Sequence, residues 1–396
     1  MKIAFVSTRG IPNNYGGFEQ FAERISEGLV ARGHEVIVYS PHFHPYKESS
    51  YHGVRIKHIF SPEKWMGSAV GSFFYDYRSL KDALFVEKPD IVYECGYTSI
   101  IPAYIKFGVC KLKSPIIVTN MDGLEYKRSK FNALVRRFIY WEEKQAVRCS
   151  HHLVADNMAI HDYYLQKYGR KSTYMAYGAD IVKEFDLGVL KPYSLTQNQY
   201  YLVIARLEPE NNIKMTIDGY IASKEYGKKP LVIVGKTNTK HGKWLVNQYG
   251  EHDCIKFVGG IYNTDALNSL RHYCYAYFHG HSVGGTNPSL LEAMASSCFI
   301  MSHDNIFNKA VLGENAFYYG SSEAVMTILN NIKPIVKECK KLYINNNLEI
   351  IASRYSWDSL VDQHERYFKR LLYGQASAEE TPAAVDDAAA TSTQLT

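Results

Sequence analysis

Short apolar runs alternate with longer amphipathic segments along most of the chain. Apolar runs of this length are typical of strands that are buried on both faces of a parallel sheet. The first series of predicted strands covers residues 2–7, 35–40, 90–96, 115–120 and 151–157. Between the first two strands, apolar side chains share one helical face, and a glycine stands where the helix should end: Phe18, Phe21, Ala22, Ile25, Leu29 and then Gly33. The pattern predicts βαβ units.

The alternation lapses over residues 178–199, where glycine, proline and polar residues gather. It then resumes, with strands predicted at 200–205, 230–235, 254–259, 273–280 and 298–303. We therefore expect an α/β protein with two Rossmann-like domains, at residues 1–185 and 195–355, facing across a ligand cleft at the carboxyl ends of their strands. An amphipathic helix at 356–373 should end the fold and pack back toward the N-terminal domain. Residues 374–396 are expected to form a disordered tail.

Composition narrows the class of protein. The net charge of +5 over 396 residues is mild and by itself predicts neither a nucleic acid nor a membrane as partner. The seven cysteines are scattered and never spaced as C-x-x-C, which suggests no disulfide framework, no structural zinc and a reducing compartment. The chain begins directly with a strand and has no apolar run of membrane-spanning length. We expect a cytoplasmic protein, with peripheral contact to the inner face of the plasma membrane left open.

The loop after the first strand carries Gly16 and Gly17 just before a predicted helix. Its glycines do not follow the G-x-G-x-x-G spacing of dinucleotide enzymes, which weakens a dehydrogenase interpretation. Glycines here let a ligand approach the helix N-terminus, where free N–H groups favour anions or hydroxyls. A simple turn is the alternative.

Two segments of the second domain are candidates for binding an anion. Arg206 ends a strand and could grip a diphosphate, unless it only pairs with Glu208 or Glu210. In "HGHSVGGTNPSLLEAMA" (279–295), Asn287 can cap a helix that starts at Pro288, so that the loop amides point at a ligand. Glu292, one turn further along this helix, could accept hydrogen bonds from a ribose. A solvated carboxylate is the commoner use of such a residue.

In the first domain, Asp122 and Glu125 follow a strand and are candidates for acid/base chemistry or contacts to sugar hydroxyls. The sequence shows no metal-ligand spacing, no nucleophile elbow and no P-loop. No metal site and no cofactor is therefore expected.

Residues 127–148 combine basic and aromatic side chains, and we expect a helix there. A basic, aromatic helix is typical of a protein that lies on an anionic bilayer, whereas a solvated face over core aromatics is the equal alternative. The basic members are Lys127, Arg128, Lys130, Arg136, Arg137, Lys144 and Arg148, and the aromatic ones are Phe131, Phe138, Tyr140 and Trp141.

On the motifs "RGIPNNYGGFE", "VTNMDGLEYKR", "VIARLEPENN" and "HGHSVGGTNPSLLEAMA", residues 1–372 resemble retaining GT-B glycosyltransferases of family four, and among them bacterial polysaccharide rhamnosyltransferases. The resemblance implies that Arg206 contacts the donor diphosphate and Glu292 the ribose. Asp122 stands where many relatives have a histidine near the transferred sugar, so Arg206 and Asp122 are the expected catalytic residues. Other donor contacts would come from Gly16, Gly17, Gly285, Thr286 and Asn287, and the acceptor side from Glu19, Asp122 and Glu125.

The chain departs from this family pattern at two positions. Gly284 replaces a glutamate that usually binds the donor sugar, so His281, Thr286 or Asn287 would have to read the sugar hydroxyls. Asn211 replaces a lysine that usually follows the diphosphate-binding arginine. Stabilisation of the leaving diphosphate would then depend on Arg206, helix amides and Lys236.

The resemblance implies metal-independent sugar transfer with retention of configuration, in cell-surface polysaccharide synthesis. The expected partners are a nucleotide-sugar donor, with dTDP-rhamnose as the candidate, a lipid-linked or oligosaccharide acceptor and an anionic membrane surface, but no nucleic acid. Two alternatives stay open: a nucleotide-sugar epimerase or phosphorylase on the same plan, and a non-catalytic nucleotide-sugar-binding module.

Overall fold

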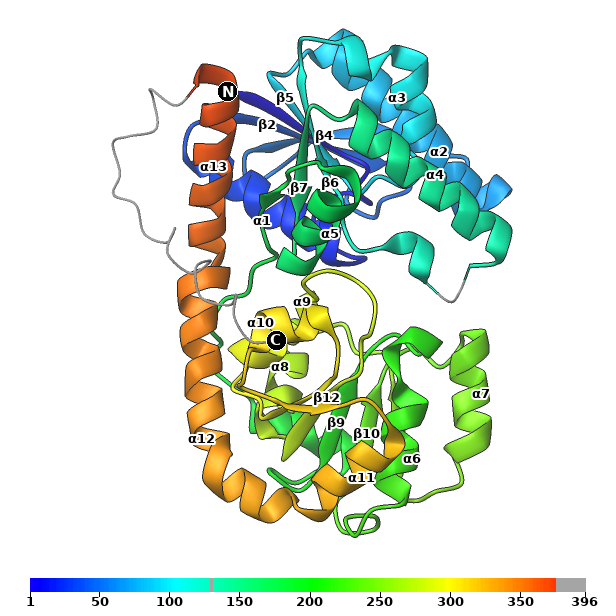
Figure 1. The fold of residues 1–396 in the computed structure, drawn as a ribbon, viewed down its shortest axis with the longest axis vertical. Helices are drawn as coiled ribbons and strands as arrows, with labels where there is room; N and C mark the ends of the chain where they lie inside the picture. The colour runs from blue at the N-terminus through cyan, green and yellow to red at the C-terminus, as the bar shows by residue number, and fades with distance from the viewer. Residues whose placement is uncertain (129–130, 375–396) are drawn as a thin grey trace.

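The computed structural model describes residues 1–128 and 131–374. The expected tail beyond Gly374 and Lys130 of the expected basic helix lie outside the described residues. Two lobes are stacked along the long axis of the molecule, and each is built around its own sheet (Figure 1). Helices α12 (Ile332–Ile350) and α13 (Trp357–Tyr373) run along one side of both lobes.

The N-terminal sheet has eight strands in the order β3-β4-β2-β1-β5-β6-β7-β8. All neighbouring strands are parallel except the β3–β4 pair. The strands are β1 Lys2–Val6, β2 Glu35–Pro41, β3 Ser50–Tyr51, β4 Val54–Ile59, β5 Ile91–Cys95, β6 Ile116–Asn120, β7 His152–Ala155 and β8 Thr173–Tyr174. The helices are α1 Gly17–Ala31, α2 Glu63–Asp82, α3 Ile101–Phe107, α4 Ala133–Cys149 and α5 Met158–Tyr168.

The C-terminal sheet has six parallel strands in the order β11-β10-β9-β12-β13-β14. Its strands are β9 Tyr201–Ile204, β10 Leu231–Val234, β11 Ile255–Gly259, β12 Ala276–His279, β13 Ile300–His303 and β14 Phe317–Tyr319. Its helices are α6 Ile213–Ile221, α7 Lys240–Tyr249, α8 Thr264–Tyr273, α9 Pro288–Ala295, α10 Ile306–Leu312 and α11 Ser322–Asn330.

Every strand expected from the apolar runs is present, within a few residues of its expected ends. The expectation missed four strands that lie at or next to sheet edges, β3, β4, β8 and β14. Three of these have only two or three residues, and β4 alternates apolar and basic residues. Short edge strands leave a weak apolar pattern because only part of their surface is buried.

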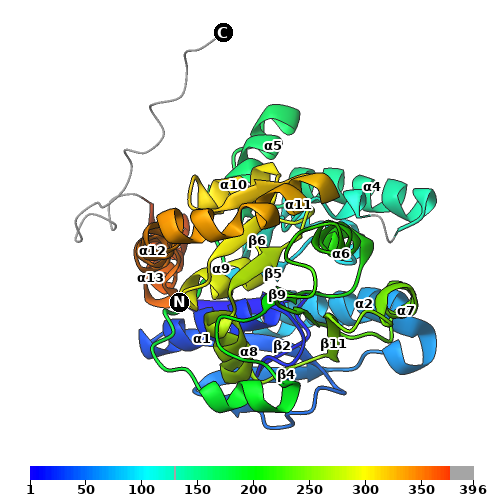
Figure 2. The same cartoon turned by 90° about the horizontal axis from the view of Figure 1, so that it is seen from below.

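Helix α13 returns to the N-terminal lobe and packs on α1. A Cβ added to Gly28 of α1 would lie 2.5 Å from a methyl carbon of Val361, so the two helices meet at glycine. The ring of Trp357 similarly covers Gly178. Near the same helix contact, His34 Nε2 and the Glu365 carboxylate are within hydrogen-bonding distance, at 2.9 Å. Viewed from below, α12 and α13 lie together near the chain's N-terminus (Figure 2). The last helix therefore ties the two lobes together.

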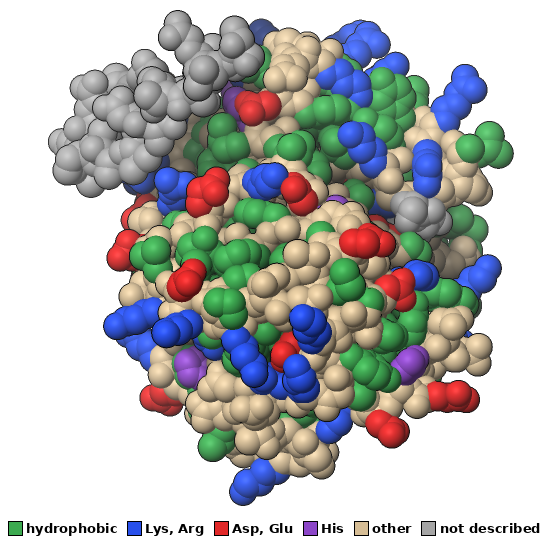
Figure 3. Space-filling model, turned by 60° about the horizontal axis from the view of Figure 1, so that its bottom comes forward, with side chains coloured by type: hydrophobic (Ala, Val, Ile, Leu, Met, Phe, Trp, Pro, Cys, Tyr) green, Lys and Arg blue, Asp and Glu red, His purple; other side chains and the backbone are tan. Residues whose placement is uncertain are grey.

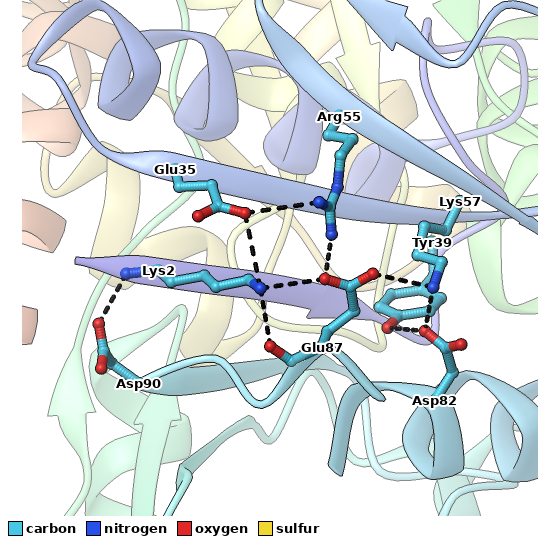
Figure 4. Close-up of polar contacts among 8 residues, drawn as sticks. All are labelled: Lys2, Glu35, Tyr39, Arg55, Lys57, Asp82, Glu87 and Asp90. Carbon is cyan, nitrogen blue, oxygen red and sulfur yellow. Dashed lines mark hydrogen bonds and ion pairs between the residues drawn. The ribbon is translucent and has the colours of Figure 1, made fainter. Parts of the chain in front are cut away.

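An ion network joins the strands β1, β2 and β4 to the segment that follows α2 (Figure 4). The Glu87 carboxylate contacts Lys2 at 3.0 Å and Lys57 at 2.9 Å, and it also pairs with Arg55. The Tyr39 hydroxyl donates to Asp82 at 2.7 Å. Burial raises the pKa of Glu87, but the bonds with its cationic neighbours more than offset this and lower the pKa to about 2.

The surface seen with the C-terminal lobe turned forward mixes acidic and basic side chains (Figure 3). One disulfide, between Cys110 and Cys149, joins the end of α4 to the segment after α3, with Cα atoms 4.3 Å apart. The expectation of no disulfide was therefore wrong. The two cysteines are 39 residues apart in sequence, and only the fold brings them together. No helix in the described part of the chain combines the length and apolarity needed to cross a membrane.

Candidate functional site

The N-termini of α1 and α9, one from each lobe, meet at the interface between the lobes. A Cβ added to Gly17 would lie 3.0 Å from the ring of Pro288. Pro288 is the first residue of α9, and the Asn287 side chain accepts a hydrogen bond from the Ser289 N–H at 3.0 Å, which confirms the expected cap. Two helix N-termini thus lie together at the interface, and the positive ends of their dipoles favour an anion there.

The glycine-rich loop before α9 packs directly on the N-terminal lobe. A Cβ added to Gly285 would lie only 1.8 Å from a carboxylate oxygen of Asp156, and a Cβ added to Gly123 would lie 2.6 Å from the Cα of Gly284. The Thr286 hydroxyl donates to the carbonyl oxygen of Asp156. Only glycine fits these contacts. Because the Thr286 hydroxyl is used between the lobes, it is not free to read a sugar in this arrangement.

Asp122 and Glu125 lie on the N-terminal side of the interface. Asp122 has a left-handed backbone (φ 48°), and its N–H donates to the Asn120 side chain at 3.0 Å. This turn leaves the Asp122 side chain half-buried. Burial, and after it the charge of Asp122, raises the pKa of the Asp156 carboxyl. Glu125 pairs with Arg128 at 2.5 Å, so its charge is balanced within its own lobe.

Arg206 and Lys236 follow neighbouring strands, β9 and β10, and both side chains are exposed. The Asn211 side chain donates to the Arg206 carbonyl at 2.7 Å and therefore closes the loop that presents the guanidinium. Asn211 thus has a structural use where the family pattern has a lysine. The Lys236 ammonium lies 5.1 Å from the ring centre of Tyr262. Two cations are therefore presented along one edge of the C-terminal sheet.

Two stacked histidines lie where β12 ends. The rings of His279 and His281 are 4.4 Å apart and nearly parallel. Burial and the nearby charges of Arg206 and Arg128 lower the pKa of His281 to about 3, and burial lowers the pKa of His279 as well. His281 is therefore neutral near pH 7 and can offer a sugar a neutral ring nitrogen but no positive charge.

Glu292 is held by a residue that the sequence analysis missed. The fully buried guanidinium of Arg271 donates to Glu292 Oε2 at 2.5 Å and to the Asn268 side chain at 3.1 Å. Glu292 itself is 26% exposed, so part of its carboxylate faces solvent while Arg271 fixes its direction. No motif marks Arg271, which comes from α8 and meets α9 only in the folded domain.

Glu19 and Gly16 order the loop that precedes α1. The Glu19 carboxylate is buried and accepts from the Arg9 N–H at 2.7 Å. Burial raises its pKa, even though that backbone bond opposes the shift. Its contacts place Glu19 beneath the loop, where it holds Arg9 and Gly16 in position.

The expected basic helix is shorter than predicted. Helix α4 begins at Ala133, and Lys127 belongs to a separate turn at 125–127, so the expectation of one helix from residue 127 was wrong. An open groove of about 770 Å³ lies beside this turn. Its lining is basic and aromatic: Tyr126, Lys127, Arg136, Arg137, Tyr140 and Lys167. Among the described residues, no group of histidine, cysteine and carboxylate side chains is placed to hold a metal ion.

Comparisons with known proteins agree with this architecture. Residues 191–354 match the family described as "Glycosyl transferases group 1", and residues 1–180 match a "Domain of unknown function (DUF1972)". No curated protein matches the chain in sequence.

Solved structures resemble the whole chain in fold. Sucrose-phosphate synthase from Thermosynechococcus elongatus superimposes with a TM-score of 0.74 at 14% identity, covering 94% of this chain and 100% of that one. The Anabaena protein HepE in complex with UDP-glucose gives 0.70 at 14% identity, covering 93% and 99%. A glycosyltransferase from Rickettsia africae gives 0.66 at 11% identity, covering 94% and 99%.

The fold is therefore GT-B, with two Rossmann-like domains. The C-terminal lobe is the part of the chain that matches the glycosyl transferases group 1 family. The family match and the fold both agree with a glycosyltransferase.

Proposed function

We propose that this protein transfers a sugar from a nucleotide-sugar to a membrane-borne acceptor, with retention of configuration and without a metal. The observation that carries the proposal is the meeting of the α1 and α9 N-termini at Gly17 and Pro288, with Arg206 and Lys236 presented on the C-terminal side. A diphosphate that leaves the sugar develops negative charge, which helix amides and fixed cations stabilise where it forms. Glu292, fixed by Arg271, would accept hydrogen bonds from the ribose.

Replacing Arg206 tests the diphosphate assignment. Arg206→Ala should lower turnover by about 10²–10³-fold, which is the scale of one lost charge-stabilising donor. Arg206 is exposed, so this variant should fold normally. Arg366→Ala, which removes an exposed arginine from α13, is the matched control and should keep full activity. Full activity of Arg206→Ala would refute the assignment.

The identity of the donor is a separate part of the proposal. We propose a 6-deoxy sugar donor, dTDP-rhamnose, and this choice rests on the resemblance of the motifs to rhamnosyltransferases. A panel of nucleotide-sugars screened by thermal stabilisation tests it, because a ligand that binds only the native state raises stability. Stabilisation by dTDP-rhamnose above UDP-glucose supports the choice, and the opposite order rejects it. Conversion of donor without any acceptor would instead indicate an epimerase.

An exposed apolar surface supports a lipid-linked acceptor and a membrane contact. Helices α2 and α4 touch through Phe73 and Phe138, whose ring centres are 6.0 Å apart. Large apolar side chains are exposed on both helices, up to 75% for Trp65 and 79% for Leu134. This α2–α4 surface also includes Met66, Val70, Phe74, Val135 and Trp141. Exposed apolar side chains beside basic residues are typical of a protein that lies on an anionic bilayer.

Vesicle binding tests the membrane contact. The protein should sediment with vesicles that contain anionic phosphatidylglycerol and much less with pure phosphatidylcholine. Arg136→Gln with Arg137→Gln should weaken this binding by roughly 5-fold per charge, from about 1 kcal/mol each. Leu134→Ser should weaken it further. Leu342→Ser, which changes an exposed leucine on α12, is the control. Equal binding to both vesicle types would reject a membrane role for this surface.

A further inference from the structure

Asp156 is a buried carboxyl group that no other side chain satisfies. It follows β7 directly and precedes Asn157, which caps α5. The residue is 1% exposed, and neither carboxylate oxygen has a side-chain hydrogen-bond partner within the described part of the chain; the groups nearest to bonding it are the backbone N–H groups of Asp156 itself and of Thr286. A buried carboxyl with so few partners destabilises the fold, so a residue of this kind needs an explanation.

The position of Asp156 supplies an explanation for its buried carboxyl group. Its Oδ1 atom is so close to Gly285 that any side chain there would collide with it, and its carbonyl oxygen accepts from Thr286. The carboxyl group therefore comes from the N-terminal lobe but lies against the glycine-rich loop before α9, which belongs to the C-terminal lobe. It adjoins Gly284, the position at which the loop lacks the glutamate of the family pattern.

We propose that Asp156 is the sugar-contacting carboxyl group of this protein, accepting hydrogen bonds from hydroxyls of the donor sugar in place of the side chain missing at Gly284. The inference rests on the proposed function, since it needs a nucleotide-sugar in the interface. The sugar would enter where Gly284 and Gly285 now cover the carboxyl. Gly284 has a positive φ of 127° and no atoms near its missing side chain, so the loop has room on that side.

This arrangement also explains why residue 285 is a glycine. A small residue there lets a carboxyl from the other lobe reach the loop. Tyr177 contacts Gly17 at the start of α1, and the charges of Asp122 and Asp156 both act on its hydroxyl, so the two carboxyls and the α1 N-terminus belong to one region of the interface. Sugar specificity would then depend on both lobes and not on the C-terminal loop alone.

Asp156→Asn is the main test, because it keeps the shape of the side chain and its contact with Gly285. Titration calorimetry compares dTDP with dTDP-rhamnose and UDP with UDP-glucose on the wild type and the variant. We expect unchanged affinity for the nucleoside diphosphates and about 10-fold weaker binding of the nucleotide-sugar, from one weakened hydrogen bond in a buried site. Asp162→Asn, an exposed aspartate on α5, is the matched control.

Thermal unfolding separates this role from a structural one. Asp156→Asn should unfold at the same temperature as the wild type or above it. The substitution removes a destabilising buried carboxyl group, which the wild type would retain because function needs it. Loss of nucleoside diphosphate and nucleotide-sugar binding together, or a lowered unfolding temperature, would make Asp156 structural and overturn the inference. Wild-type affinity of the variant for the sugar donor would overturn it while leaving the proposed function intact. If the wild type binds none of these nucleotides, the proposed function fails and the inference fails with it.

Discussion

The ion pair of Glu292 and Arg271 allows a quantitative test of the packing in the C-terminal lobe. The two partners differ in environment, since Arg271 is 1% exposed and Glu292 is 26% exposed. An arginine remains charged in any protein environment, so removal of its partner leaves a buried, uncompensated charge. The perturbation is Glu292→Ala.

The magnitude follows from the geometry. Opposite unit charges about 4 Å apart attract by about 4 kcal/mol at the effective dielectric of a partly exposed site. Breaking a buried pair by removing one partner costs about 3–5 kcal/mol, and the partial exposure of Glu292 places this pair at the lower end. We expect Glu292→Ala to lose about 3 kcal/mol of unfolding free energy. For a domain of this size, that corresponds to a fall in Tm on the order of 10 °C.

Removal of the other partner, Arg271, should lower the unfolding free energy by less. In Arg271→Met, the remaining Glu292 carboxylate can be solvated, and methionine fills most of the vacated volume. We expect a loss of about 1–2 kcal/mol for Arg271→Met, and a similar value for the double variant with Glu292→Ala. The coupling between the two sites should therefore be about 2–3 kcal/mol.

Urea unfolding followed by circular dichroism measures these free energies, and calorimetric scans give Tm. Glu251→Ala, which removes an exposed carboxylate in the same domain, is the control and should change stability by less than about 0.5 kcal/mol. The reasoning is refuted if Glu292→Ala is as stable as the control, or if Arg271→Met proves the more damaging single change.

Three further predictions concern other contacts. The depressed pKa of Glu87, about 2 against 4.5 for an ordinary glutamate, stabilises the fold above pH 4.5 by about 1–2 kcal/mol once screening by solvent is allowed for, and this contribution is lost as the pH falls toward 2. The unfolding free energy of wild type minus Glu87→Gln, measured at pH 5.5 and pH 3, should therefore shrink on acidification, and a constant difference would contradict the pairing. Gly285→Ala should lower stability by about 1–3 kcal/mol through its collision with the Asp156 carboxylate, and Asp156→Ala in the same chain should recover most of the loss in a thermal scan. Gly28→Ala should cost a similar amount by pushing on Val361, and it should be rescued by Val361→Ala if the contact between α1 and α13 is the cause.

Much of the fold could be predicted because its strands are buried on both faces. Strands such as β1 and β10 form continuous apolar runs that need no tertiary information to recognise. The Asn287 cap and the Pro288 helix start follow from local geometry, since a capping side chain bonds the backbone two residues away. Edge strands, the start of α4 and the Cys110–Cys149 pair were missed because each depends on neighbours that are distant in sequence.

The residues of the candidate site also fall into two groups, those that the sequence indicated and those that it did not. Arg206 and Gly17 stand out because one follows a strand and the other begins a helix, where α/β proteins bind ligands. Arg271 carries no such signal because it lies within a helix, and the sequence analysis passed over Asp156 because it falls within the run predicted as a strand at 151–157. Their importance comes from what lies opposite them, a single carboxylate for Arg271 and a glycine for Asp156.

The sequence by itself determined the two-domain α/β plan, most of the strands and the Asn287 cap, because these depend on local periodicity and on residues with special backbone properties. Only the tertiary structure decided which charges are paired, which glycines are contacts and which carboxyl lies against Gly285. Those properties depend on distances between segments that are far apart in sequence, and such a distance leaves no periodic trace along the chain.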